Sequence, residues 1–225
     1  MVASALKEIS GWENDILFAS GVSNSGEKSD NNYQREIDLV KLYLGKIIQP
    51  ASFVYFSTSS IFDPSKAMNP YILHKLKIEA LIKNSNINYL IVRLPNLVGY
   101  SENPNTLTNY FADSIRLNRP IILKSQAIRH LIDAKDLAAI LCDIKNKFGT
   151  DKIVVDVETS NPLRAEQILA MIENGMNKKA IIQNAVEARE PDSGNKDMKS
   201  SSINYRFNTE IDYHRNLLMK YYSTQ

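Results

Sequence analysis

The chain has 225 residues, 44% of them hydrophobic, and its 27 Lys and Arg against 25 Asp and Glu give a formal net charge of +2. This length allows one sizeable core, or one core with a small appended lobe, rather than several independent domains. The balanced charge excludes a strongly basic surface for nucleic acid or anionic membrane. A single cysteine, Cys142, excludes an intrachain disulfide, and no apolar run is long enough to span a membrane. We therefore expect a cytoplasmic protein with neither nucleic acid nor membrane as a partner.

The first half of the chain alternates segments of helical periodicity with short apolar runs. We expect helices at residues 2–9, 33–48 and 70–83, and buried strands at residues 15–20, 53–57 and 89–94. Such alternation indicates crossover units and a parallel sheet. In these sheets ligands bind at the carboxyl ends of the strands, which is where Ser20, Thr58 and Asn96 fall.

The second half continues with further helices and one more strand. Helices are expected at residues 106–117, 136–147, 161–175 and 208–222, and a strand at 152–157. The third of these helices is predicted from Asn161 as a polar cap, Pro162 at the first position and Gly175 at the end. Residues 184–204 are polar and carry a cluster of turn-forming residues, so a long loop is expected there.

Tyr71 and Lys75 are four residues apart in a segment that should be helical, so they lie on one face. The strand expected just upstream ends in hydroxyl residues, among them Thr58. A nearby ammonium lowers the pKa of a phenol by favouring the phenolate. The trio therefore has the composition of a proton-transfer site. Taken alone, the Tyr/Lys pair could be an ordinary surface pair, and Thr58 only a polar strand end.

Four motifs follow one another in the chain: Phe-Ser-Thr-Ser-Ser-Ile-Phe at residues 56–62, Pro-Tyr-Ile-Leu-His-Lys-Leu-Lys-Ile-Glu at 70–79, Val-Arg-Leu-Pro-Asn-Leu-Val-Gly at 92–99, and Arg-His-Leu-Ile-Asp-Ala-Lys-Asp-Leu-Ala at 129–138. Together they resemble the extended short-chain dehydrogenase/reductase family of nucleotide-sugar epimerases, dehydratases and reductases. The resemblance covers residues 15–157. A lone Tyr-x-x-x-Lys is weak, but four motifs in order are specific.

The resemblance implies roles for the proton-transfer trio. Tyr71 would be the general acid/base. Lys75 would depress the pKa of Tyr71 and hold the nicotinamide ribose, so both residues would also contact the cofactor. Thr58 would hydrogen-bond the substrate. The implied cofactor is NAD or NADP, and no residue spacing suggests a metal site.

Further residues take implied binding roles. Asn96 and Arg129 would hold the diphosphate of a nucleotide-sugar substrate, although Arg129 could instead pair with Asp133 or Asp136 on the surface. The other expected cofactor contacts are Ala19, Ser20, Gly21 and Pro95.

The implied fold is an α/β, Rossmann-like doubly wound parallel sheet. None of the 8 glycines forms Gly-x-Gly-x-x-Gly, and the helix at residues 2–9 resembles the one that follows that turn. We therefore expect a compact or N-terminally truncated member that lacks the first strand and the Gly-rich turn. Residues 1–157 would form the Rossmann-like domain, with part of 97–130 on the substrate side, and 158–225 a small C-terminal substrate-binding lobe.

Two other segments near the expected cofactor site depart from known patterns. Glu36 aligns with an asparagine that is usual in the family, and the sequence assigns it no role. Residues 21–29 nearly spell the phosphate-binding Gly-x-x-x-x-Gly-Lys-Ser loop, but Glu27 displaces the lysine and puts a carboxylate where phosphate charge would gather. The sequence therefore does not favour a nucleoside triphosphatase.

The sequence thus predicts an NAD(P)-dependent oxidoreductase or epimerase acting on a nucleotide-linked sugar, and the resemblance implies a homodimer. The alternative is a cofactor-free binding or scaffold protein descended from such an enzyme, because the missing Gly-rich turn removes the usual pyrophosphate contacts.

Overall fold

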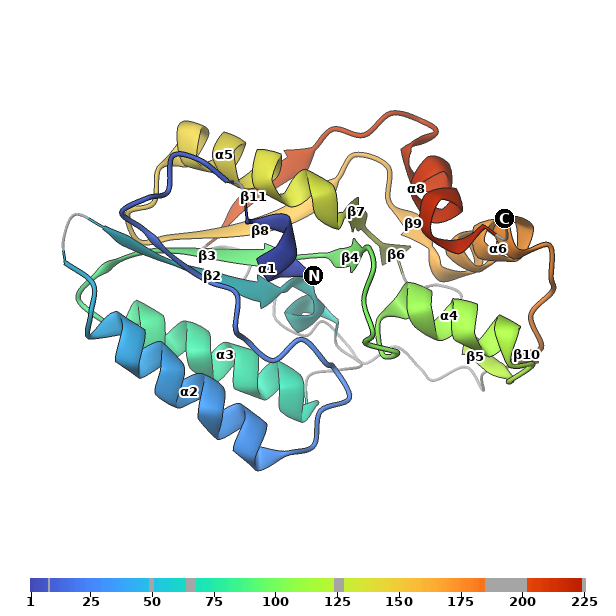
Figure 1. Ribbon diagram of the computed structural model, residues 1–225, viewed down its shortest axis with the longest axis horizontal. Coiled ribbons are helices and arrows are strands. Elements are labelled where there is room, and N and C mark those ends of the chain that lie inside the picture. The colour runs from blue at the N-terminus through green and yellow to red at the C-terminus, as the bar shows by residue number, and fades with distance from the viewer. Residues whose placement is uncertain (8, 49–50, 64–67, 124–127, 185–201, 224–225) are drawn as a thin grey trace.

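The computed structural model describes residues 1–7, 9–48, 51–63, 68–123, 128–184 and 202–223. Its centre is a sheet of five parallel strands in the order β1-β2-β3-β8-β11 (Figure 1). These strands are β1 (Ile16–Phe18), β2 (Ser52–Thr58), β3 (Asn88–Leu94), β8 (Ile153–Thr159) and β11 (Ile203–Phe207). The predicted α/β, Rossmann-like parallel sheet is confirmed.

Helices cover both faces of this sheet (Figure 1). On one face lie α2 (Asp30–Leu44) and α3 (Pro70–Lys83), and on the other lie α5 (Leu137–Phe148) and the short α1 (Val2–Ala5). Residues 52–57 of β2 and 89–94 of β3 are buried without a break, as expected for parallel strands covered on both sides.

The start of α3 is fixed by its own sequence. The Asn69 side chain accepts a hydrogen bond of 2.9 Å from the Tyr71 backbone N–H, and Pro70 occupies the first helical position, where no N–H is needed. These two residues fix the start of the helix. Tyr71, in its first turn, therefore lies next to the carboxyl end of β2.

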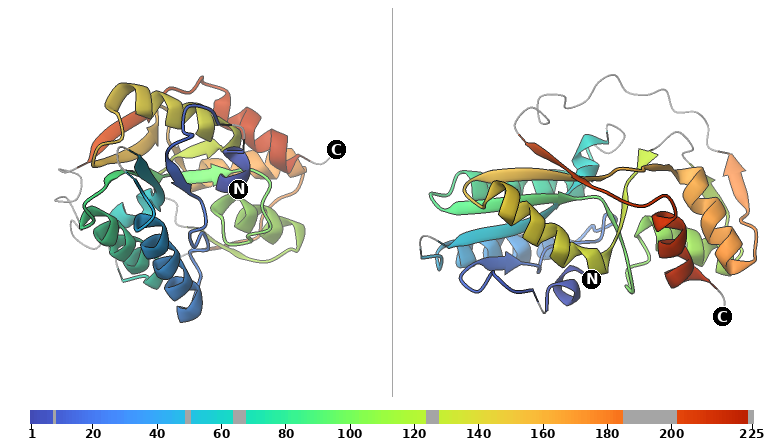
Figure 2. Two further views of the ribbon diagram at one scale, coloured as in Figure 1. Left: turned by 60° about the vertical axis from the view of Figure 1, so that its left-hand side comes forward. Right: turned by 90° about the horizontal axis from the view of Figure 1, so that it is seen from above.

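A second group of helices lies beyond the carboxyl ends of the sheet strands (Figures 1 and 2). It consists of α4 (Leu107–Arg116), α6 (Ala165–Met176) and α8 (Tyr213–Tyr222), which pack around a hydrophobic cluster of their own. The remaining short strands form three pairs: β4 (Asn96–Val98) with β7 (Leu131–Asp133), β5 (Ile121–Leu123) with β10 (Ile182–Asn184), and β6 (Ile128–Arg129) with β9 (Leu163–Arg164). Two single turns of 3-10 helix, Ser59–Phe62 and Ala134–Asp136, complete the described elements.

Several predicted boundaries are wrong. The first helix ends at Ala5 rather than residue 9, because Leu6 and Trp12 both pack into the sheet core and the chain bends between them. Helix α2 begins three residues early, at Asp30, and ends at Leu44. Helix α6 begins at Ala165 rather than 161, since residues 163–164 pair as strand β9 and the Arg164 N–H is capped by Gln167 Oε1 at 2.8 Å. Helix α8 begins at Tyr213 rather than 208.

The predicted loop at residues 184–204 is also partly wrong. Ile203 and Asn204 start strand β11, which pairs with β8 from Ile203 to Phe207 and buries Tyr205. Strand β11 therefore belongs to the main sheet, although it lies in the range expected for the C-terminal lobe. Residues 185–201 of the expected loop lie outside the described residues. In the part of the chain that the structure describes, no helix has the length and apolar character needed to cross a membrane.

Candidate active site

A cavity of about 530 Å³ opens at the carboxyl ends of β1, β2 and β3. Its walls come from the loop after β1, the end of β2, the start of α3 and the loops around β4 and α4. It is lined by eight of the nine predicted site residues: Ala19, Gly21, Thr58, Tyr71, Lys75, Pro95, Asn96 and Arg129. The ninth, Ser20, is exposed and not among the lining residues, and its backbone carbonyl accepts a hydrogen bond of 3.2 Å from Arg35 Nη2.

Tyr71 and Thr58 meet in this cavity. The Thr58 hydroxyl lowers the pKa of the Tyr71 phenol, against the larger effect of burial. Thr58 Oγ1 accepts the Ser60 backbone N–H at 3.1 Å, so the Thr58 O–H can still donate to another oxygen. A hydroxyl pair of this kind can pass a proton and bind a carbonyl or hydroxyl oxygen of a substrate. Tyr71 itself is 9% exposed.

Lys75 lies one helical turn after Tyr71 and is almost completely buried. Its Nζ is 3.2 Å from Glu36 Oε1 and donates a hydrogen bond of 3.0 Å to the Tyr55 hydroxyl. Nζ lies 5.8 Å from the centre of the Tyr71 ring and 4.9 Å from that of Tyr55. The ammonium group therefore has a carboxylate as its direct partner in this structure.

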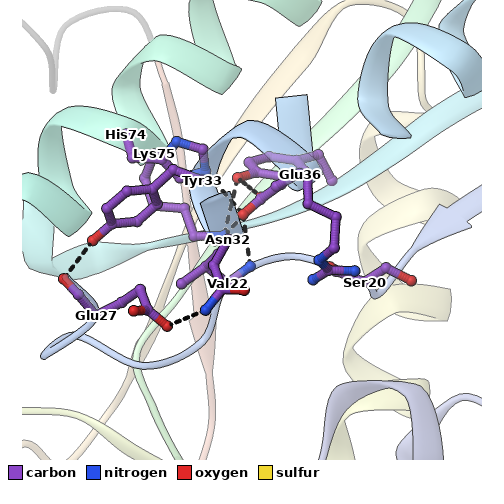
Figure 3. Close-up of polar contacts among 10 residues, drawn as sticks. Ser20, Val22, Glu27, Asn32, Tyr33, Glu36, His74 and Lys75 are labelled. Atoms are coloured by element: carbon purple, nitrogen blue, oxygen red, sulfur yellow. Dashed lines mark hydrogen bonds and ion pairs between the residues drawn. The ribbon is translucent and has the colours of Figure 1, made fainter. Parts of the chain in front are cut away.

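Glu36, to which the sequence assigned no role, is the centre of this network (Figure 3). The side chain is fully buried, and four groups surround its carboxylate. Oε1 accepts the Tyr55 hydroxyl at 2.8 Å and faces Lys75, while Oε2 accepts the Val22 backbone N–H at 2.6 Å and contacts His74 Nε2 at 2.9 Å. Because a carboxylate oxygen can only accept, the proton between these groups belongs on His74 Nε2.

The environment shifts the pKa of Glu36, Lys75 and Tyr71. Burial raises the pKa of Glu36, but the hydrogen bond with His74, the Lys75 charge and the bonds from Val22 and Tyr55 outweigh it, and the pKa falls to about 2. Burial lowers the pKa of Lys75, against the opposing effect of Glu36. Burial also raises the pKa of Tyr71 above its ordinary value of 10, and the Glu36 charge adds to this, against the Thr58 hydrogen bond.

Arg129 and Asn96 lie in the part of the cavity nearest β4, β6 and β7. The Arg129 guanidinium is 3.6 Å from Asp63 Oδ2, not paired with Asp133 or Asp136, and is about one-fifth exposed. Asp133 instead pairs with Lys220. The Asn96 side-chain N–H donates to the His130 carbonyl at 3.1 Å. Arg129 is thus a cation on the cavity wall that could bind an anionic group.

The near-match to a phosphate-binding loop carries a carboxylate where a phosphate would bind. Glu27 Oε1 accepts the backbone N–H groups of Lys28 and Ser29, both at 2.8 Å, and Oε2 accepts the Asn32 side chain at 2.8 Å. The amides that a triphosphate would need are therefore bound within the chain, just before helix α2. Figure 3 shows the contact of Glu27 with Asn32. Among the described residues, no three His, Cys, Asp or Glu side chains are arranged to hold a metal ion.

Glu36, Tyr55 and His74 were missed as site residues, and one signal in the sequence pointed to Glu36. Tyr33, Ile37 and Val40 form the buried face of helix α2, and Glu36 lies on that same face. A charged residue within an apolar helix stripe needs a buried partner. The sequence did not reveal that the partner is Lys75, because the pair is 39 residues apart.

Comparisons with solved structures give the same fold. The UDP-N-acetylglucosamine 4-epimerase from Methanobrevibacter ruminantium, solved with UDP-N-acetylmuramic acid, is 15% identical with a TM-score of 0.67, covering 98% of this chain and 77% of the epimerase. The UDP-glucose 4-epimerase from Thermus thermophilus, solved with NAD, is 14% identical with a TM-score of 0.62, covering 98% and 80%. The UDP-glucuronic acid 4-epimerase from Bacillus cereus, solved with UDP-glucuronic acid and NAD, is 17% identical with a TM-score of 0.63, covering 100% and 73%.

Sequence comparison identifies the family. No curated protein matches the chain. The model of the NAD dependent epimerase/dehydratase family matches residues 18–155, which include β2, β3, α2, α3 and the cavity residues from Ala19 to Arg129. This is more than half of the chain, and the chain belongs to the NAD dependent epimerase/dehydratase family.

Proposed function

We propose that the protein is an NAD(P)-dependent oxidoreductase or epimerase acting on a nucleotide-linked sugar, with Tyr71 as the acid/base. The observation that carries this proposal is the convergence of Thr58, Tyr71 and Lys75 on one cavity that also exposes Arg129. The cavity volume of about 530 Å³ is within the range of small-molecule sites. The structural neighbours solved with NAD and UDP-sugars support the choice of ligands.

The residues present fit the nicotinamide end of a dinucleotide. Ala19 and Gly21 have small side chains or none, so a flat ring can approach the backbone next to Tyr71 and Lys75. When bound, the cofactor would supply hydride transfer to or from a sugar carbon. The pyrophosphate end lacks the Gly-rich turn, so its contacts must come from other residues.

The chain's own residues would then handle the proton and the substrate. Tyr71 exchanges a proton with the reacting sugar oxygen, and Thr58 hydrogen-bonds the same oxygen and orients the phenol. Arg129 offers a planar guanidinium that suits the oxygens of a diphosphate, and Asn96 lies beside it as a second substrate contact.

Replacing Tyr71 with phenylalanine tests the role of the phenol. Tyr71→Phe keeps the ring in its buried position and removes the hydroxyl that moves the proton. We expect kcat to fall by about 10²- to 10⁴-fold with little change in KM for a UDP-linked keto sugar. Turnover would be measured from the loss of dihydronicotinamide absorbance, and circular dichroism would verify the fold. Wild-type turnover in the variant would contradict the assignment of Tyr71.

Two observations favour a second candidate, a cofactor-free binding or scaffold protein. The sequence has no Gly-rich turn, and the Lys75 ammonium is already paired with Glu36. Such a protein would bind a UDP-sugar in the cavity with the same affinity whether or not a dinucleotide is present. Calorimetric titration of a UDP-sugar with and without NAD separates the candidates, because an enzyme that binds both ligands in one cavity should show an affinity that changes when NAD is added.

A further inference from the structure

The buried Glu36–Lys75 pair changes the electrostatics of the proposed proton-transfer site. The carboxylate is 3.2 Å from Nζ, so it opposes the lysine charge at close range in a site of low dielectric constant. Side chains at both ends of the pair are 3% exposed or less, so water screens the interaction little. A lysine in this state presents much less positive charge to Tyr71 than an isolated ammonium would.

The local backbone is built around this pair. A Cβ atom at residue 21 would lie 2.8 Å from Glu36 Oε1 and 3.0 Å from Lys75 Nζ, so only glycine leaves room for both groups. The Val22 N–H that follows donates directly to Glu36. The loop after β1, helix α2 and helix α3 thus meet at one carboxylate, which is a built feature rather than a chance surface contact.

Each element packed against Tyr71 and Lys75 contributes titratable groups. Helix α2 contributes Tyr33 and Glu36, strand β2 contributes Tyr55, and helix α3 contributes His74 and Glu79. Glu79 is itself paired with Arg93 at 2.7 Å, so its charge is largely balanced. Among these groups Glu36 lowers the stability of a Tyr71 phenolate, while the Thr58 hydroxyl is the neutral group that favours it.

We propose that Glu36 is a positioning residue that holds Lys75 and cancels its charge, so that the resting site presents Tyr71 as a proton donor for reduction of a keto group. This inference rests on the proposed function and selects keto reduction within it. Epimerisation begins with removal of a hydroxyl proton, which requires the phenolate, whereas keto reduction begins with the phenol.

Reduction of the keto group uses a dihydronicotinamide dinucleotide as the reductant. The carbonyl carbon gains a hydride, the C=O π bond opens onto oxygen, and that oxygen takes the Tyr71 proton. The sugar ketone is reduced and the dinucleotide is oxidised. The phenolate then recovers its proton from solvent, with the Thr58 hydroxyl as its hydrogen-bond partner.

The test is a pH titration of the free protein labelled at the tyrosine Cζ with ¹³C and followed by NMR. The Tyr71→Phe variant assigns the Tyr71 signal, since that signal alone disappears. In the wild type the signal should stay at its protonated position up to pH 10, the ordinary pKa of a tyrosine. In Glu36→Gln, which removes the carboxylate charge that raises the pKa of Tyr71, the titration midpoint should fall by about one pH unit or more. The control Glu27→Gln removes a carboxylate that does not contact Lys75 and should leave the midpoint unchanged.

Two results would overturn the proposal: a wild-type Tyr71 signal that titrates below pH 10, or a Glu36→Gln midpoint equal to that of the wild type. If Glu36→Gln does not fold, the wild-type titration alone decides. Turnover supplies an independent readout. As the pH is raised, kcat for keto reduction should stay level to pH 10 in the wild type, and in Glu36→Gln it should begin to decline at a lower pH. A protein that shows the predicted titrations but no turnover would refute the proposed function and leave the role of Glu36 in place.

Discussion

Gly21 is the residue whose replacement tests the Glu36–Lys75 network most simply. An alanine Cβ would be 2.8 Å from Glu36 Oε1 and 3.0 Å from Lys75 Nζ, and both side chains are too buried to move aside easily. We expect Gly21→Ala to lower the free energy of unfolding by about 1–3 kcal/mol, as overpacking does. Urea denaturation would measure it.

The matched control for this change is Gly45→Ala at the end of helix α2. The backbone there is helical with φ −72°, and the nearest atom to an added Cβ is 3.6 Å away. Alanine should therefore be neutral or stabilise by up to about 1 kcal/mol. Equal destabilisation by the two substitutions would contradict the crowding at residue 21.

Glu36 also makes the free energy of unfolding depend on pH in the acid range. Its pKa is about 2 in the folded protein and 4.5 in the reference state, so the stabilisation is complete above pH 4.5 and lost as the pH falls through about 2. The shift corresponds to roughly 3 kcal/mol. We expect the free energy of unfolding to fall less steeply between pH 4.5 and 2 in Glu36→Gln than in the wild type.

Glu27 supplies the comparison for this pH effect. Backbone hydrogen bonds from Ser29 and Lys28, with the Asn32 side chain, lower its pKa too, but the group is at the surface and screened by water. Glu27→Gln should change the acid slope less than Glu36→Gln does. A larger change in Glu27→Gln would contradict the dominant role of the buried carboxylate.

At the scale of elements, Arg93 ties helix α3 to strands β3 and β8. The guanidinium is 1% exposed, contacts both carboxylate oxygens of Glu79 at 2.7 and 3.0 Å, and pairs with Asp156 at 3.3 Å. Removing it takes the cation from the buried Asp156 carboxylate and leaves Glu79 with the partly exposed Lys83 at 3.3 Å. We expect Arg93→Ala to lower the free energy of unfolding by about 3–5 kcal/mol, measured by urea denaturation.

An exposed ion pair provides the contrast. Arg116 pairs with Asp113 on the surface of α4, with its side chain 61% exposed. Arg116→Ala should change the stability by less than about 1 kcal/mol. Arg93→Ala with an equally small effect would mean that the buried carboxylates find other partners or take up protons.

Elements with strong local signals could be predicted from the sequence. Asn69 and Pro70 fix the start of α3, and the i, i+4 spacing places Tyr71 and Lys75 on one face of it. Strand β11 was missed because it is short, and its stability comes from pairing with β8, which lies 48 residues earlier at Ile203 and Val155. The role of Glu36 was missed for the same reason, since its partners lie on other elements.

At the scale of the whole molecule, the site forms where two hydrophobic clusters meet. The sheet with its flanking helices supplies Thr58, Tyr71 and Lys75, and the region of α4, α6 and α8 closes the far side of the cavity with the start of α4. Figure 2 shows these two regions side by side. The division at residue 157 stays a prediction, with strand β11 as a segment that returns to the sheet after it.

Binding of a nicotinamide dinucleotide decides between an enzyme and a cofactor-free protein, because the sequence has no Gly-rich turn and Lys75 is paired with Glu36. Isothermal titration of the wild type and of Tyr71→Phe with NAD, NADH, NADP and NADPH would measure it. We expect saturable binding of at least one dinucleotide to both proteins, with a dissociation constant of roughly 1–100 μM. Absence of binding to the folded wild-type protein at millimolar dinucleotide would contradict it and leave the cofactor-free alternative.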